Sequence, residues 1–195
     1  KQGDKFPDLT KEQLLELTGK DVHPVEISGN LVDLTVREGE YEGSPVRSFK
    51  AVLDDVIKIN GDDKKVRTYV DFGLGSFNGR TAANLVLNLK AFENVKFSSW
   101  ASHDKATGKS YSKISLRQGD STETIKWKYD PKADVSPFPA PREFEGKGGK
   151  TERDYTATEV FLYGELEKFA EVVKTAAKNA PKSAPKAEVP APSDT

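Results

Sequence analysis

The sequence has no cysteine and no methionine, and only two histidines, His23 and His103, among its 195 residues. Without cysteine there is no disulfide framework, no thiolate nucleophile and no cysteine-based zinc site. Two histidines cannot build a three-histidine metal site, and neither belongs to a pattern that would make a catalytic pair. We therefore predict a protein that is not an enzyme and that has no catalytic residues, no metal and no cofactor.

Long apolar runs are missing as well. No stretch approaches the ~18 apolar residues of a membrane span, and residues 1–5 lack the apolar core of a signal peptide. The missing initiator methionine indicates a processed or trimmed start. We expect a soluble, cytoplasmic protein with no membrane partner.

The formal net charge is only −1, because 30 Lys and Arg nearly balance 31 Asp and Glu. It is unevenly distributed, however. Residues 1–43 carry 5 Lys/Arg against 10 Asp/Glu, residues 44–129 carry 15 against 9, and residues 130–195 carry 10 against 12. A positive middle between acidic flanks indicates an anionic partner for the middle, although chance clustering on a solvated surface would give the same pattern.

Apolar residues recur with a period of two through most of this middle region. In the first predicted strand the apolar phase switches at Leu31/Val32, just after Gly29, as it does at a β-bulge. A turn is predicted over 38–43, and Asn60-Gly61 is a strong hairpin signal. Further predicted strands lie at 46–59, 65–72, 95–101, 111–117 and 124–129.

Two helices are predicted outside the N-terminal region. One is capped by Ser76 or Asn78 and carries Ala82, Leu85, Leu89 and Phe92 on one face. The other begins with a capping box at Thr156 to Glu159, and its apolar stripe is Leu162, Leu166, Phe169, Val173 and Ala177.

The order strand, strand, strand, helix, strand, strand suits the five-stranded Greek-key barrel known as the OB-fold, with its helix between strands 3 and 4. A less closed α+β roll fits the same pattern. The predicted organisation is an N-terminal helical arm (1–21), an OB-fold nucleic-acid-binding domain (22–130), a Pro/Gly-rich connection (131–153), a C-terminal amphipathic helix (154–179) and a disordered tail (180–195).

The predicted strand faces opposite the apolar stripes carry cations interleaved with rings. This combination suits single-stranded nucleic acid, because cations follow phosphates and rings stack on unpaired bases. We expect phosphate contacts from the cations and stacking from the rings; the set is Lys50, Arg67, Tyr69, Lys96, Trp100, Tyr111, Lys113 and Arg117. Trp127, in the cluster Lys126-Trp127-Lys128-Tyr129, shares its phase with Ile125 and is expected to be core or half-buried.

Other motifs have simpler explanations. The glycines of 73–79 miss the dinucleotide-binding spacing by one position and indicate a flexible strand-to-helix connection, beside which Arg80 could hold a phosphate. The doublets Asp54-Asp55 and Asp62-Asp63 lack calcium-loop spacing and are expected to be solvated turn residues.

Several short segments resemble a group of small bacteriophage OB-fold proteins that bind single-stranded DNA. They are Ile27 to Val32, Arg37 to Gly43, Val46 to Phe49 and Ile125 to Lys128, within residues 25–129. The resemblance implies sequence-independent binding of single-stranded DNA in replication or recombination, with replication proteins as further partners, and location in the host cell cytoplasm if the protein is phage-encoded. It implies no catalytic residue.

An alternative function is a non-enzymatic protein-interaction or virion-assembly module. In that case the apolar stripe of the C-terminal helix would be the partner surface, and the barrel would be a scaffold.

Overall fold

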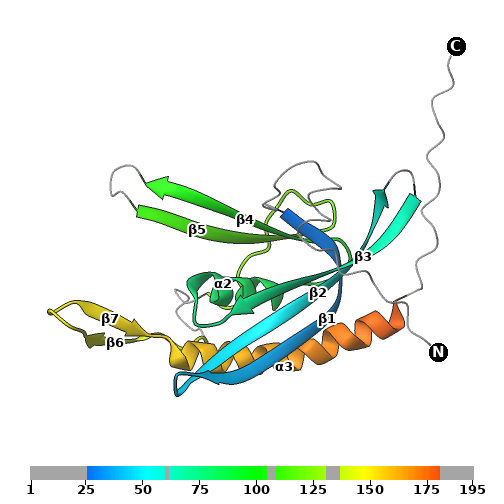
Figure 1. Ribbon diagram of the computed structural model, residues 1–195. Helices are drawn as coiled ribbons and strands as arrows, with labels where there is room; N and C mark the ends of the chain where they lie inside the picture. Colours follow the sequence, from blue (N-terminus) through cyan, green and yellow to red (C-terminus); the bar gives the residue numbers. More distant parts are fainter. Residues whose placement is uncertain (1–25, 60–61, 105–108, 131–136, 181–195) are drawn as a thin grey trace, which may run out of the picture.

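The computed structural model describes residues 26–59, 62–104, 109–130 and 137–180 of the chain. Its main feature is a five-stranded antiparallel sheet in the order β3-β2-β1-β4-β5 (Figure 1). The strands are β1 (Glu26–Tyr41), β2 (Ser44–Ile59), β3 (Asp62–Gly73), β4 (Val95–Asp104) and β5 (Lys109–Gln118). The predicted N-terminal arm, the Asn60-Gly61 turn and the tail beyond residue 180 lie outside the described residues.

β1 joins the two halves of the sheet. Its first residues pair with β4, as in Ile27↔Phe97, whereas the rest pairs with β2, as in Leu34↔Ala51. Between the halves the register shifts at Leu31/Asp33, so the predicted bulge is confirmed. The bulge keeps apolar side chains on one side of a bent strand, because the extra residue compensates for the change of alternation.

The turn between β1 and β2 is tighter than predicted. β1 extends to Tyr41, so only Glu42 (φ 50°) and Gly43 (φ 76°) form the turn. The sequence predicts a turn over all of 38–43. Two successive residues with positive φ suit a two-residue hairpin loop, because this geometry matches the right-handed twist of the strands.

The core lies on the inner face of the sheet, beneath α2 (Phe77–Val86) and α3 (Thr156–Asn179). Phe49 and Phe97 are buried there, and Phe72 packs between them with ring centroids 5.0 and 5.6 Å away. All three were predicted to be core residues.

α2 begins as predicted but ends early. The Ser76 hydroxyl accepts the Gly79 N–H at 2.9 Å and caps the helix. Asn88 and Leu89 donate to carbonyls only three residues back, at 3.0 Å each, so the last turn tightens and the helix stops. Leu89 and Phe92, predicted as part of the helix, follow it and still pack in or against the core.

α3 runs along β1 (Figure 1). Three residues of its predicted apolar stripe are buried, and the other two, Phe169 and Ala177, are half-buried. Leu162, Leu166 and Val173 are completely inaccessible to solvent. The predicted capping box at Thr156 is wrong, because Asp154 takes the capping role. Its Oδ1 accepts the Thr156 N–H at 2.8 Å and the Thr156 hydroxyl at 2.6 Å.

The strand predicted for residues 124–129 is not formed, because the segment runs beside α2 and bonds mainly to the side chains of Asn84 and Asn88. The Pro/Gly-rich connection predicted for 131–153 contains, within the described residues, a hairpin of β6 (Arg142–Glu145) and β7 (Thr151–Asp154), which projects from the rest of the molecule (Figure 1).

The sheet is open. The expected closed barrel would pair β3 with β5, but no such pairing occurs among the described residues. Instead α2 contacts both strands and lies between them (Figure 1). Within the described ranges, no helix is both long and apolar enough to cross a membrane.

Candidate nucleic-acid interface

Alternation along β2 and β3 separates the core from an outer face, which is the side of the sheet that carries the predicted binding residues. Inward-facing Phe49 and Ala51 flank Lys50, and Lys50 pairs in register with Asp71. Tyr69 opposes Val52, and Arg67 opposes Asp54. The structure therefore brings Lys50, Arg67 and Tyr69 together on one face, as the alternation predicts.

Tyr69 presents an accessible ring beside a cation. Its exposed fraction is 49%, and the Lys50 Nζ lies 5.4 Å from the ring centroid. The same Nζ is 3.7 Å from the Asp71 carboxylate, so Lys50 is shared between the ring and an acid. A base stacked on Tyr69 would place its phosphate near Lys50, where it would compete with Asp71.

Arg67 is held more firmly by an acid. Its Nε and Nη2 donate to the two carboxylate oxygens of Asp54 at 2.6 and 2.7 Å, a bidentate pair. The hydrogen bond with Asp54 raises the pKa of Arg67 above its ordinary value. Arg67 thus stays charged, but a phosphate would meet it through an existing ion pair.

The other predicted residues lie on the β4–β5 hairpin, where they belong to every second cross-strand pair. Lys96 opposes Arg117, Trp100 opposes Lys113, and Tyr111 opposes Ser102. The side chains of Trp100 and Tyr111 lie outside the described part of the structure, so their stacking role remains a prediction.

Cations on this hairpin differ in their availability. Arg117 Nη2 donates to Glu26 Oε2 on the neighbouring strand β1. Lys113 is exposed and Lys96 half-buried, and neither forms an ion pair with another described residue. Of the five predicted phosphate contacts, Lys96 and Lys113 are therefore the ones with unshared charge in the described structure.

One further cation on the outer face was missed. Arg37 opposes Ser48, two positions from Thr35, which opposes Lys50. Arg37 is exposed and has no ion pair to a described residue. The signal was available in the sequence, because Arg37 continues the alternation of Thr35, but it lies next to the region predicted as a turn.

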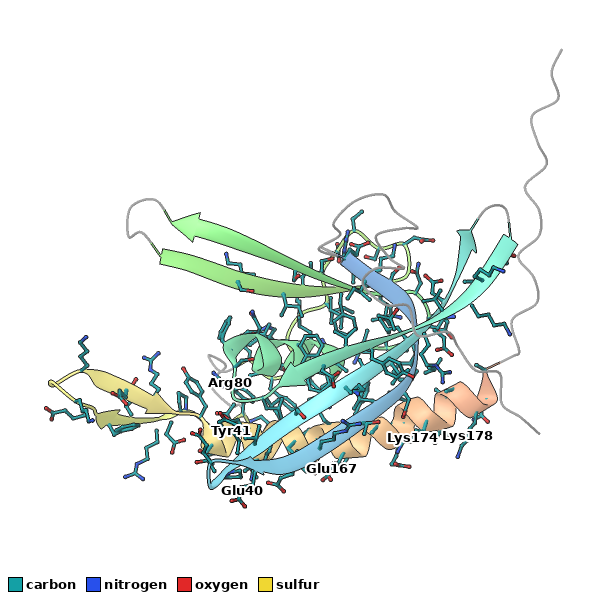
Figure 2. All side chains as sticks on the ribbon, viewed as in Figure 1. Glu40, Tyr41, Arg80, Glu167, Lys174 and Lys178 are labelled. Atoms are coloured by element: carbon teal, nitrogen blue, oxygen red, sulfur yellow. The ribbon has the colours of Figure 1, made fainter. Side chains whose placement is uncertain are left out.

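The tip of the β1–β2 hairpin has the opposite character. A shallow hollow of about 420 Å³ there is lined by Glu38, Gly39, Glu40, Gly43 and Pro45. Tyr41 beside it is 68% exposed (Figure 2). The carboxylates disfavour a phosphate chain, so the anionic tip marks one limit of the candidate interface.

Arg80 does not serve the phosphate role considered for it. It lies at the base of α2 (Figure 2), where its Nη1 donates to the carbonyls of Leu74 and Gly75 at 3.0 and 2.7 Å. Its guanidinium stacks 3.9 Å from the Tyr155 ring centroid and lies 3.8 Å from Glu159. Burial lowers the pKa of Arg80. Arg80 instead ties α3 to the connection between β3 and α2.

The remaining chemistry candidates are structural. The described residues contain no group of three or more His, Cys, Asp or Glu side chains arranged to hold a metal ion. Asp54 pairs with Arg67, and Asp55 Oδ1 accepts the N–H of Val56 at 2.7 Å. Comparison of the chain with family models, curated protein sequences and solved structures finds no match. The described arrangement places the exposed ring of Tyr69 beside Lys50, on an outer face where Lys96 and Lys113 form no ion pair with another described residue.

Proposed function

We propose that this protein binds single-stranded DNA without sequence preference, on the outer face of its sheet. The observation that carries the proposal is the pairing of exposed Tyr69 with Lys50 on the same face of β2–β3. A stacking surface beside a cation matches the repeating unit of a single strand, in which each base is followed by a phosphate.

The strand order supports the same function. The order β3-β2-β1-β4-β5, with a bent first strand and a helix after β3, is the order of an OB-fold in which the closing β3–β5 pair is not made. We propose that the sheet is an opened OB-fold. Such folds commonly bind single strands over strands 2 and 3 and through the β1–β2 and β4–β5 loops. Here β2 and β3 carry Lys50 and the exposed Tyr69, and β4 and β5 carry Lys96 and Lys113.

The resemblance to small bacteriophage proteins extends the proposal to a biological setting. We propose a role in DNA replication or recombination, in a host cell cytoplasm, where the protein coats exposed strands and meets replication proteins. Phosphate contacts are assigned to Lys50, Arg67, Lys96, Lys113 and Arg117, and stacking to Tyr69, Trp100 and Tyr111.

A titration with labelled oligo-dT and with duplex DNA of equal length tests the proposal. We expect binding to the single strand, weaker binding to the duplex, and loss of affinity in the double variant Lys96→Ala/Lys113→Ala. The matched control is Lys147→Ala/Lys150→Ala, which removes two exposed cations between β6 and β7. Equal affinity of the two double variants, or no binding by the wild type, would contradict the proposal.

Tyr69 supplies a second test. Removing a stacking ring costs about 1–3 kcal/mol of binding free energy per base, so Tyr69→Ala should weaken oligo-dT binding to this extent. Tyr41→Ala, which removes a more exposed ring at the anionic tip, should leave binding unchanged.

The alternative function gains no support from α3. Its apolar stripe faces the core, with Leu162 and Leu166 inaccessible to solvent, so a partner could not reach the stripe without unfolding the helix from the sheet.

A further inference from the structure

The Lys126-Trp127-Lys128 segment is a second place where exposed cations flank an exposed ring. Trp127 is 38% exposed, more than its shared phase with Ile125 predicts, and both lysines are exposed. The segment is neither helix nor strand, so ordinary ladder hydrogen bonds do not explain its shape.

Side chains from α2 and from the turn that follows it fix the backbone of this segment on both sides of Trp127. Asn84, itself 1% exposed, donates to the Tyr129 carbonyl and accepts the Tyr129 N–H, each at 2.8 Å. Asn88 Nδ2 donates to the Lys126 carbonyl at 3.0 Å. These bonds hold the residues before and after the indole, and they lower the entropic cost of binding at an irregular segment.

The segment also begins beside the proposed DNA path. Ile125 donates its N–H to the Leu116 carbonyl at 2.7 Å, which places the start of the segment against the edge of β5. Leu116 is the chain neighbour of Arg117, one of the cations on the outer face. A strand that crosses β4–β5 would therefore meet Lys126 next as it leaves the sheet.

The two lysines of the segment differ in whether their charge is shared with a neighbouring group. Lys128 Nζ lies 3.8 Å from Glu165 and 5.1 Å from the Tyr129 ring centroid, so its charge is partly shared. Lys126 has no ion pair with a described residue, although Glu123 and Asp130 flank the segment in sequence. Lys126 is thus the cation available beside the indole.

We propose that Lys126 and Trp127 form a second contact for single-stranded nucleic acid, which continues the path from β4–β5 over the edge of the sheet. This inference rests on the proposed function. In it Trp127 stacks on an unpaired base and Lys126 holds an adjacent phosphate. The contact lengthens the bound strand, so it is engaged by long oligonucleotides and not by short ones.

The two tryptophans allow a direct experiment, because Trp100 and Trp127 are the only ones in the chain. In Trp100→Phe, the sole indole emission comes from Trp127. We expect this emission to be quenched on titration with oligo-dT of about 30 nucleotides. An oligo-dT of about 8 nucleotides, a length within the range that a single OB-fold covers, should quench it much less. Unchanged Trp127 emission while anisotropy reports binding of the long oligonucleotide would overturn the inference.

An affinity measurement accompanies the spectroscopic one. Trp127→Ala should bind the long oligonucleotide about fivefold more weakly and the short one equally well, whereas Trp127→Phe should retain most of the affinity. The control is Phe144→Ala, which removes a ring of similar exposure (43%) from β6. Thermal unfolding establishes that each variant is folded. Equal long-oligonucleotide affinity of folded Trp127→Ala and the wild type refutes this contact alone, whereas absence of any binding by the wild type refutes the proposed function.

Discussion

Single residues on the outer face show that its cations are largely balanced by neighbouring carboxylates. Lys50, Arg67 and Arg117 face Asp71, Asp54 and Glu26 respectively. The Lys50–Asp71 pair has an exposed carboxylate, and ion pairs at the surface contribute only about 0–1 kcal/mol, so a phosphate can replace Asp71 at modest cost. The acids would then set the affinity by competing with DNA.

Asp71→Asn tests this competition. The substitution frees Lys50 while leaving Tyr69 in place, so we predict about twofold tighter oligo-dT binding, in line with the small energy of an exposed pair. Fluorescence anisotropy at low salt measures the change. Glu152→Gln, which removes an exposed carboxylate on β7, controls for net charge. If both variants tighten binding equally, the effect is long-range charge and not competition at Lys50.

These pairs also explain what the sequence reveals about the site. Alternation predicts that Lys50, Arg67 and Tyr69 share a face, because their spacing along each strand has a period of two. It cannot reveal that Arg67 meets Asp54, since that contact depends on which residues oppose one another across β2 and β3. Register is set by turn geometry and core packing, neither of which a single strand's pattern contains.

At the scale of elements, the bend of β1 depends on Gly29. Its φ is +157°, and a Cβ there would lie 3.0 Å from the Asp54 carbonyl oxygen and 3.1 Å from Leu53 Cβ. The strand crosses closely over β2 at this position, just before the bulge that redirects it from β4 to β2.

We predict that Gly29→Ala lowers the free energy of unfolding by about 1–3 kcal/mol, the usual cost of overpacking a tight contact. Gly39→Ala is the matched control, because Gly39 lies on the same strand and a Cβ there would meet no atom within 4 Å. Urea denaturation of both variants measures the difference. Equal stability would show that β1 can bend without the close crossing.

The contact between α3 and the 124–129 segment predicts a pH dependence. Burial, aided by the hydrogen bond to Glu165, raises the pKa of Tyr129 to about 12 from 10.0. Hydrogen bonds, first from Lys168 and then from Tyr129, lower the pKa of Glu165 below 4.5. The neutral phenol therefore stabilises the fold below pH 10 and this contribution is lost as the pH rises toward about 12. The Glu165 carboxylate stabilises it above pH 4.5 and this is lost on acidification.

Tyr129→Phe should accordingly remove part of the alkaline loss of stability and make the acid-side loss smaller, because Glu165 then lacks one of the hydrogen bonds that lower its pKa in the folded protein. Thermal unfolding as a function of pH follows both limbs. Tyr41→Phe is the control, because Tyr41 is 68% exposed at the hairpin tip. Identical alkaline limbs for wild type and Tyr129→Phe would show that the phenol does not couple to folding.

Elements with a strong periodic pattern were predictable, whereas those defined by tertiary partners were not. The bulge, the long strands and the buried stripe of α3 follow from alternation and helical spacing. Residues 124–129 alternate like a strand but lie beside α2, where Asn84 supplies the bonds that a neighbouring strand would have made. The sequence from Thr124 to Tyr129 contains no local signal that predicts its hydrogen bonds to Asn84.

For the whole molecule, the pairing of cations with carboxylates limits how strongly binding responds to salt. Each phosphate neutralised on a single strand adds about −0.7 to the slope of log affinity against log salt. When a phosphate replaces the carboxylate of an existing ion pair, one anion is exchanged for another. A cation already paired with a carboxylate therefore contributes little to the slope of log affinity against log salt.

The five assigned cations would give a slope of about −3.5 if all were free, whereas Lys96 and Lys113 alone give about −1.4. We predict the smaller value for an oligonucleotide of about 8 nucleotides, which covers the sheet only. In Asp71→Asn the slope should steepen by about −0.7, because Lys50 then acts as a free cation. Anisotropy titrations over a series of salt concentrations measure both slopes. A wild-type slope near −3.5 would mean that the carboxylates leave the outer face before DNA binds, and that the ion pairs of Lys50, Arg67 and Arg117 do not control affinity.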